Sequence, residues 1–260
     1  MHDLTVVTVV LNDVAGLRRT LDSMRSVLSA GELVQHVIID GGSVDGTGDV
    51  AREYADSEFA ESVVVVSERD AGLYDAMNKG LALANGRYVL FLNADDEISG
   101  PEVFSIVLER LRTVQPVWLI SRTAFLNEVR DIVGISENMP FSRWRHLLGL
   151  QMHAHPSTIV RRDVLVELGG FNYDLADFAA DWDVVVQVAR KAPNPVEVDD
   201  VLSLFAAGGL SERRIADTHK VLGRIRDVRL GGRPGIRLLN GLWTGLLDWR
   251  LHQKLTAGSI

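Results

Sequence analysis

The chain has 260 residues, of which 47% are hydrophobic and 24% charged, a composition typical of one globular domain or of a domain with an appendage. It contains no cysteine, which excludes disulfides, thiolate metal sites and a cysteine nucleophile. The net charge of −8 argues against general nucleic-acid binding. No basic leader precedes the first apolar run, and no run approaches the roughly 18 apolar residues of a membrane span, so we expect a cytoplasmic protein.

Apolar strands alternate with helical segments in the first part of the chain. The strands are expected at residues 4–11, 34–39, 63–66 and 88–92. Between them, Asp13 is placed to cap a helix that carries Leu17, Leu21 and Met24 on one face, and further helices are expected up to about residue 54 and over residues 75–84. This alternation predicts an α/β fold with a mostly parallel central sheet flanked by helices.

The chain is less regular between residues 112 and 150 and becomes patterned again after that. We expect helices at residues 141–150, 163–168 and 183–189, and strands at residues 117–120, 155–161 and 196–205.

The C-terminal tail differs in charge from the rest of the chain. From Ser211 to Ile260 there are ten Lys and Arg and four Asp and Glu, so the tail carries +6 and the remainder −14. Apolar residues recur there at helical spacing, at Leu239, Leu242, Trp243, Leu246 and Leu247. Two interpretations stay open: a terminal helix that packs on the rest of the chain or on another subunit of a homo-oligomer, or an interfacial helix on an anionic membrane, here the inner face of the plasma membrane.

The most informative segment is the strand that runs from Val89 to Leu92 and ends in Asn93-Ala94-Asp95-Asp96. Strands of an α/β sheet present functional residues at their carboxyl ends. Carboxylates at such a position hold a divalent cation, which in turn binds a diphosphate. The alternative is an ordinary exposed acidic turn, because Asp and Asn are common turn residues.

Two further polar segments follow strands. Asp40-Gly41-Gly42-Ser43 precedes a helix and has neither the dinucleotide fingerprint nor a Walker loop, which leaves a nucleotide pocket and a tight turn as alternatives. Residues 68–80 are unusually polar, and helix capping alone accounts for Asp70 and Asp75 but not for the whole run.

The order of these segments carries a resemblance to a known family. Thr8 to Asn12, Asp40 to Thr47, Asp70 to Gly80 and Asn93 to Asp96, in this order, closely resemble the family-2 glycosyltransferases of GT-A fold, the Rossmann-like fold of nucleotide-diphospho-sugar transferases. The resemblance continues at His155-Pro156-Ser157-Thr158, Gly169-Gly170-Phe171, Ala180-Asp181-Trp182-Asp183 and Gly208-Gly209-Leu210-Ser211. Each motif is modest alone, but their order and spacing are specific.

The resemblance covers about residues 4–211 and implies how the chain is divided. It implies a catalytic domain over residues 1–211, with a nucleotide-binding half at about 1–98 and an acceptor-binding half at about 99–211. Residues 212–260 lie outside it as a basic, amphipathic helical extension. The Gly208 to Ser211 loop is expected to close over the donor.

The resemblance also implies a donor site and a metal, Mn²⁺ or Mg²⁺. The expected donor contacts are Thr8, Val10, Asn12, Asp40, Gly41, Ser43, Asp70, Asn78, Asn93, Ala94 and Asp95. Asn93-Ala94-Asp95 stands at the Asp-x-Asp motif, which binds the sugar-nucleotide diphosphate through a metal. Because Asn93 brings no charge, Asp95 is the leading metal ligand and Asp96 the second.

For catalysis, Asp181 matches the acid that is the base in inverting members. A carboxylate activates an acceptor hydroxyl by taking its proton as the new bond forms. The alternative role for Asp181 is an N-cap of the helix expected at residues 183–189. His155 is a candidate contact to the diphosphate or acceptor, or else a core histidine. Trp182 is also expected on the acceptor side, where a role in packing is favoured over a role as a stacking surface for a sugar.

The hypothesis that follows is an inverting, metal-dependent glycosyltransferase. It would move a sugar from a nucleoside-diphosphate sugar to a hydroxyl of a glycan, glycolipid or lipid-linked acceptor. Two alternatives remain: a sugar-1-phosphate nucleotidyltransferase, which would normally carry a Gly-rich basic loop that the first strand lacks, and a sugar-nucleotide-binding protein without catalysis.

Overall fold

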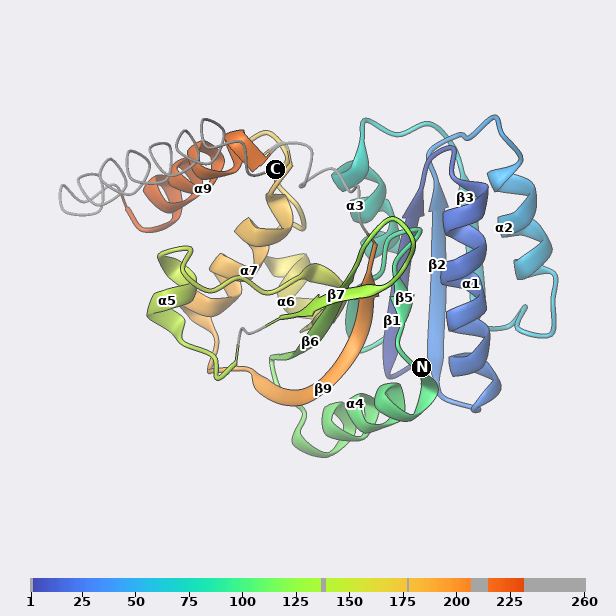
Figure 1. Cartoon of the computed structure of the whole chain (residues 1–260), viewed down its shortest axis with the longest axis horizontal. Helices are drawn as coiled ribbons and strands as arrows, with labels where there is room; N and C mark the ends of the chain where they lie inside the picture. The colour runs from blue at the N-terminus through green and yellow to red at the C-terminus, as the bar shows by residue number, and fades with distance from the viewer. Residues whose placement is uncertain (1, 137–138, 177, 207–214, 232–260) are drawn as a thin grey trace.

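The computed structural model describes residues 2–136, 139–176, 178–206 and 215–231, with side chains in the last range from residue 220. Within these ranges the strands form one sheet in the order β3-β2-β1-β4-β8-β6-β9-β5, with β7 paired to β6 (Figure 1). Helices cover both faces of this sheet, as the alternating pattern predicts.

The parallel part of the sheet has β1 (Leu4–Val10) at its centre, between β2 (Val34–Asp40) and β4 (Tyr88–Phe91), with β3 (Val63–Ser67) outside β2. Every residue of β1, β2 and β4 is buried, which explains their nearly continuous apolar sequences. All four predicted strands are confirmed.

The helices of the first half follow the strands closely. α1 (Val14–Ser29) begins after Asp13, whose side chain accepts a hydrogen bond from Gly16 N–H, so the predicted cap is confirmed. α2 (Thr47–Ala55) and α3 (Leu73–Leu83) follow β2 and β3. α4 (Pro101–Val114) was not expected, although Pro101 at its first position and its apolar face of Phe104, Val107, Leu108 and Leu111 are helix signals.

The second half adds β5 (Glu97–Ile98), β6 (Trp118–Leu126), β7 (Ile132–Ile135), β8 (Thr158–Arg161) and β9 (Val196–Phe205). β8 runs antiparallel to β4, and β6 runs antiparallel to β8 and parallel to β9. The strand at 196–205 was predicted with its exact bounds. β6 is longer than the predicted 117–120, and the β6–β7 hairpin was not expected.

Several helices of the second half have bounds that differ from the predicted ones. α5 (Arg143–Leu147) is shorter than the predicted 141–150, and α6 spans Arg162–Glu167. A 3-10 helix, η1 (His155–Ser157), occupies the start of the strand expected at 155–161. The helix predicted at residues 183–189 is α7 (Ala180–Lys191), which begins three residues earlier than predicted and has Ala179 as its N-cap. Asp181 therefore lies in the first helical turn rather than at a cap.

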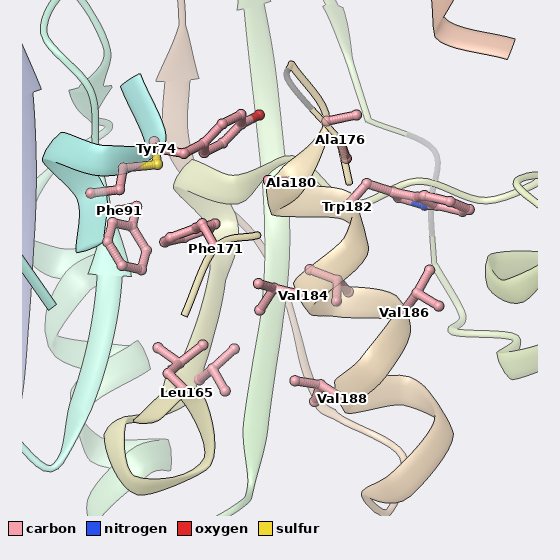
Figure 2. Close-up of a cluster of buried hydrophobic side chains, with 14 of the residues drawn as sticks. Tyr74, Phe91, Leu165, Phe171, Ala176, Ala180, Trp182, Val184, Val186 and Val188 are labelled. Carbon is pink, nitrogen blue, oxygen red and sulfur yellow. The ribbon is translucent and has the colours of Figure 1, made fainter. Parts of the chain in front are cut away.

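One hydrophobic cluster joins the two halves (Figure 2). Phe171 stacks on Tyr74 of α3 with ring centroids 5.6 Å apart and meets Phe91 of β4 edge-to-face at 4.8 Å. Trp182 of α7 belongs to the same cluster and is only 3% exposed. This burial supports the packing role expected for Trp182.

α9 (Ile215–Arg229) packs against α7 in the last described segment. Arg229 donates to both carboxylate oxygens of the fully buried Asp183, each at 2.7 Å. The expected loop at Gly208 to Ser211 and the amphipathic helix around Trp243 lie outside the described residues. Among the residues that the structure describes, there is no helix of sufficient length and apolar character to cross a bilayer.

Candidate active site

The carboxyl ends of β1 and β2 are joined by hydrogen bonds between their loops. Asn12 N–H donates to Ser43 Oγ at 2.7 Å, and Asn12 Oδ1 accepts from Val44 N–H at 2.9 Å. Asn12 adopts a positive φ of 51°, a conformation that Asn tolerates better than most residues. The structure thus brings together Asn12 and Ser43, which are distant in sequence and were both expected at the donor site.

Asp40 and Asp70 lie at the same edge in different environments. Asp40 is fully buried, and its oxygens accept hydrogen bonds from Ser43 N–H at 3.1 Å and Ser67 Oγ at 2.6 Å. Asp70 is partly exposed and lies against Gly41, where an added Cβ would be 2.5 Å from Asp70 Oδ2. Gly41 therefore leaves the space that Asp70 occupies, and Asp70 is the more accessible of the two carboxylates.

Three expected donor contacts have their side chains engaged inside the protein. Thr8 is fully buried, with its hydroxyl 2.9 Å from His36 Nε2, and Val10 is a core residue of β1. Asn78 holds the backbone of Phe171, accepting from its N–H at 2.8 Å and donating to its carbonyl at 3.0 Å. These side chains are therefore engaged within the protein, and their contact with a donor stays a prediction.

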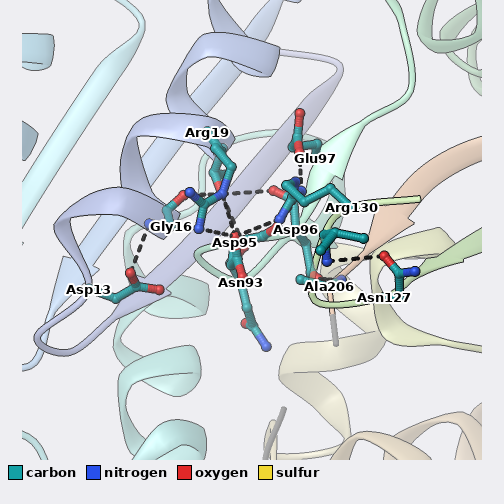
Figure 3. Close-up of polar contacts among 12 residues, drawn as sticks. Asp13, Gly16, Arg19, Asn93, Asp95, Asp96, Glu97, Asn127, Arg130 and Ala206 are labelled. Carbon is teal, nitrogen blue, oxygen red and sulfur yellow. Dashed lines mark hydrogen bonds and ion pairs between the residues drawn. The ribbon is translucent and has the colours of Figure 1, made fainter. Parts of the chain in front are cut away.

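Asp95 lies between arginines from two distant segments (Figure 3). Asp95 Oδ1 is 2.6 Å from Arg19 Nη2 and 2.9 Å from Arg130 Nη1. Arg130, in the turn between β6 and β7, also pairs with Glu97. The charge of Asp95 is thus balanced by protein cations, and its side chain ties α1 and the β6–β7 hairpin to the end of β4. The following Asp96 faces another way.

Asp96 is buried beside the first residue of the 3-10 helix. Its Oδ1 accepts from Ala206 N–H at 3.0 Å, and its Oδ2 is 3.9 Å from His155 Nε2. Burial raises the pKa of Asp96 to about 7, because desolvation penalises its charged form. A cation brought to Asp96 would therefore find a carboxylate with few protein partners, in contrast to Asp95.

Asn93 connects the end of β4 to His155. Its Nδ2 donates to His155 Nε2 at 3.0 Å. The next residue, Ala94, donates its backbone N–H to Val9 O at 3.1 Å and leads the main chain into the turn. Asn93 Oδ1 is buried and has no hydrogen-bond partner among the residues that the structure describes. Since buried polar atoms are nearly always paired, this oxygen is available to a ligand.

Asp181 completes the group from the first turn of α7. Its Oδ1 accepts a hydrogen bond from the Tyr74 hydroxyl at 2.9 Å, and its Oδ2 is 3.5 Å from His155 Nδ1. Burial favours a higher pKa for Asp181, but the contacts with His155 and Tyr74 outweigh it and hold that pKa below its usual value. His155 is thus placed between Asp181 on one side and Asn93 and Asp96 on the other.

Sequence reasoning did not single out Tyr74, Arg19 or Arg130. Tyr74 belongs to a segment that was recognised as too polar for capping alone, but its partner lies on another helix. Arg19 and Arg130 had no local signal, since each meets Asp95 only in the folded chain. Within the described part of the chain, no three His, Asp or Glu side chains are already grouped as a metal site.

Comparison with known proteins identifies the family of the chain. The model of the family described as "Glycosyl transferase family 2" matches residues 5–169. An uncharacterized glycosyltransferase of Mycobacterium tuberculosis is 32% identical over 216 residues, covering 81% of this chain and 78% of the relative. A PGL/p-HBAD biosynthesis glycosyltransferase of Mycobacterium bovis is 30% identical over 247 residues, covering 90% and 87%.

Solved structures are similar in fold. The mannosyltransferase PcManGT from Pyrobaculum calidifontis, in complex with GDP-Man and Mn²⁺, has a TM-score of 0.67 at 19% identity and covers 99% of this chain and 76% of its own. S. aureus TarS in complex with UDP-GlcNAc has a TM-score of 0.68 at 18% identity, covering 88% and 66%. The predicted GT-A fold is confirmed. The chain is a glycosyltransferase that belongs to family 2.

Proposed function

We propose that this glycosyltransferase moves one sugar from a nucleoside-diphosphate sugar to a hydroxyl of a glycan, glycolipid or lipid-linked acceptor, with inversion at the anomeric carbon. Asp181 takes the proton of the acceptor hydroxyl as its oxygen attacks that carbon. The new carbon–oxygen bond forms while the bond to the diphosphate breaks, and the nucleoside diphosphate leaves. This displacement passes through no covalent glycosyl-enzyme.

The observation that carries the proposal is the position of Asp181. Its carboxylate lies 3.5 Å from His155, which in turn contacts Asn93 at the end of β4. The candidate base therefore lies beside the strand ends that gather Asn12, Ser43 and Asp70, the candidate contacts to the nucleotide. The low pKa of Asp181 keeps it ionised at neutral pH, as a base requires.

The residues at the end of β4 fit a divalent cation, Mn²⁺ or Mg²⁺, because both ions prefer oxygen ligands. Asn93 and Asp96 both lie against His155, and Asn93 Oδ1 and the buried Asp96 carboxylate are oxygen ligands of this kind, the former without a partner among the described residues. Asp95 is held by Arg19 and Arg130. We therefore infer that Asp96 and Asn93 Oδ1 hold the cation and that Asp95 supports their turn. When bound, the cation supplies positive charge for the departing diphosphate.

The comparisons support the chemical class of both substrates. The neighbours' complexes contain GDP-Man with Mn²⁺ and UDP-GlcNAc, which supports a nucleotide-sugar donor and a divalent metal. Relatives named for PGL/p-HBAD biosynthesis support a lipid-linked or glycolipid acceptor. The basic tail at residues 212–260 is compatible with such an acceptor, and we propose that it contacts the anionic membrane surface in which a lipid acceptor lies.

The test is Asp181→Asn, which retains the shape of the side chain and removes the base. A thermal-shift screen of UDP-GlcNAc, GDP-mannose and related donors, with and without Mn²⁺, first identifies the donor, since a ligand of the folded state raises stability. We expect D181N to lower the rate of nucleoside-diphosphate release from that donor by about 10²- to 10⁴-fold while donor affinity is unchanged.

Asp163→Asn is the matched control, because Asp163 is an exposed aspartate in an ion pair with Arg161 at the start of α6. It should turn over the donor at the wild-type rate. Full turnover by D181N would refute the base assignment. Donor binding without any turnover by the wild-type protein, with or without added acceptors, would favour a non-catalytic sugar-nucleotide-binding protein.

A further inference from the structure

We propose that Tyr74 is a positioning residue, whose hydroxyl fixes one oxygen of Asp181 so that the other is presented to the acceptor. The inference rests on the proposed function, in which Asp181 is the base. Tyr74 and Asp181 are 107 residues apart in sequence, and their hydrogen bond of 2.9 Å joins α3 of the nucleotide-binding half to α7 of the acceptor-binding half.

The ring of Tyr74 is held rigidly. The residue is only 4% exposed, and its ring stacks on Phe171 at 5.6 Å with 25° between the ring planes. Phe171 in turn packs against Phe91, and its backbone N–H and carbonyl both form hydrogen bonds with the side chain of Asn78. Figure 2 shows the Tyr74 hydroxyl pointing away from this packed end of the ring and toward the start of α7. The donor to Asp181 therefore has little freedom to move.

The contact with Tyr74 gives the two carboxylate oxygens of Asp181 different surroundings. Oδ1 is occupied by the tyrosine hydroxyl, while Oδ2 lies 3.5 Å from His155. The Asp181 side chain remains 30% exposed, so the carboxylate is reachable despite these partners. A carboxylate held at one oxygen cannot rotate freely about its Cβ–Cγ bond, and reactive geometry depends on such restriction. Oδ2 is then the oxygen that receives the acceptor proton.

The test is Tyr74→Phe, which keeps the ring and its stacking on Phe171 and removes only the hydroxyl. A hydrogen bond to an ionised group is among the stronger ones in proteins, so we expect kcat to fall about 10- to 100-fold. The KM for the donor should stay unchanged, because Tyr74 contacts the base and not the nucleotide edge. Tyr74 favours the ionised form of Asp181, so Y74F should move the acid limb of the kcat/KM profile to higher pH.

Tyr88→Phe is the matched control. Tyr88 is also a buried tyrosine, 1% exposed, whose hydroxyl donates to a backbone carbonyl, that of Pro116, at 3.0 Å. Y88F should therefore remove the hydrogen bond of a buried tyrosine hydroxyl and leave both kcat and the pH profile at wild-type values. If Y74F lowers kcat without moving the acid limb, or lowers it no more than Y88F does, the positioning role is overturned.

A double variant guards against an effect on folding alone. If Tyr74 acts through Asp181, Y74F should cost nothing further when added to D181N, whereas a loss of equal size in both backgrounds would overturn the proposal. The two proposals also fail separately. Full turnover by D181N would refute the role of Asp181 as the base. If D181N loses turnover while Y74F turns over the donor at the wild-type rate, only the role of Tyr74 is refuted.

Discussion

The first and second halves of this glycosyltransferase, about residues 1–98 and 99–211, are built in different ways. In the first half, parallel strands end at one edge, and the loops that follow meet their immediate neighbours, as Asn12 meets Ser43. In the second half, candidate functional side chains meet partners from remote segments, as Asp181 meets Tyr74 and Arg130 meets Asp95. Contacts between the ends of adjacent parallel strands thus organise much of the first half, whereas contacts between remote elements organise the second.

The largest expected effect on stability tests the dependence of the second half on remote contacts. Arg229→Met leaves the fully buried Asp183 without its cation, and removing one partner of a buried pair costs about 3–5 kcal/mol of unfolding free energy. Urea denaturation measures this loss. Arg161→Met, which breaks the exposed pair with Asp163, should cost less than about 1 kcal/mol. Equal costs would mean that α9 does not stabilise α7 through this pair.

An intermediate effect concerns Asp96, at the boundary of the halves. Its folded pKa of about 7 lies above the ordinary 3.8, so its contribution to stability is fully present below pH 3.8 and is lost as pH rises to about 7. Asp96→Asn should therefore stabilise the metal-free protein, on the order of 2 kcal/mol at pH 8 and less at pH 5. Melting temperatures in EDTA across this range provide the measurement. A gain independent of pH would contradict the raised pKa.

The smallest effect tests the local construction of the first half. Gly41→Ala places a Cβ 2.5 Å from Asp70 Oδ2 and should displace that carboxylate, weakening donor binding about tenfold, or about 1.4 kcal/mol. Titration with the identified donor measures the change. Gly134→Ala in β7, where an added Cβ meets no atom of the described residues within 4 Å, should leave donor binding unchanged. Unaltered binding by G41A would show that Asp70 takes no part in the donor site.

The two halves also differ in how far sequence patterns predicted them. Each strand of the parallel part was located because it contains an apolar run bounded by turn residues, and in β1, β2 and β4 this run is wholly buried. The β6–β7 hairpin was missed because β7 is short and lies at the outside of the sheet, where three of its four residues are exposed. α4 was missed although its signals were present in Pro101 and the apolar face behind it.

The sequence by itself determined the α/β class, the parallel strands, the Asp13 cap and the family, because these depend on periodicity and on the order of short motifs. Only the tertiary structure decided that Asp95 is paired with arginines, that Asn93 and Asp96 meet His155, and that Tyr74 holds Asp181. The physical reason is distance along the chain. A strand or cap is specified by neighbouring residues, whereas a hydrogen bond between α3 and α7 exists only after the core around Phe171 has brought the two helices together.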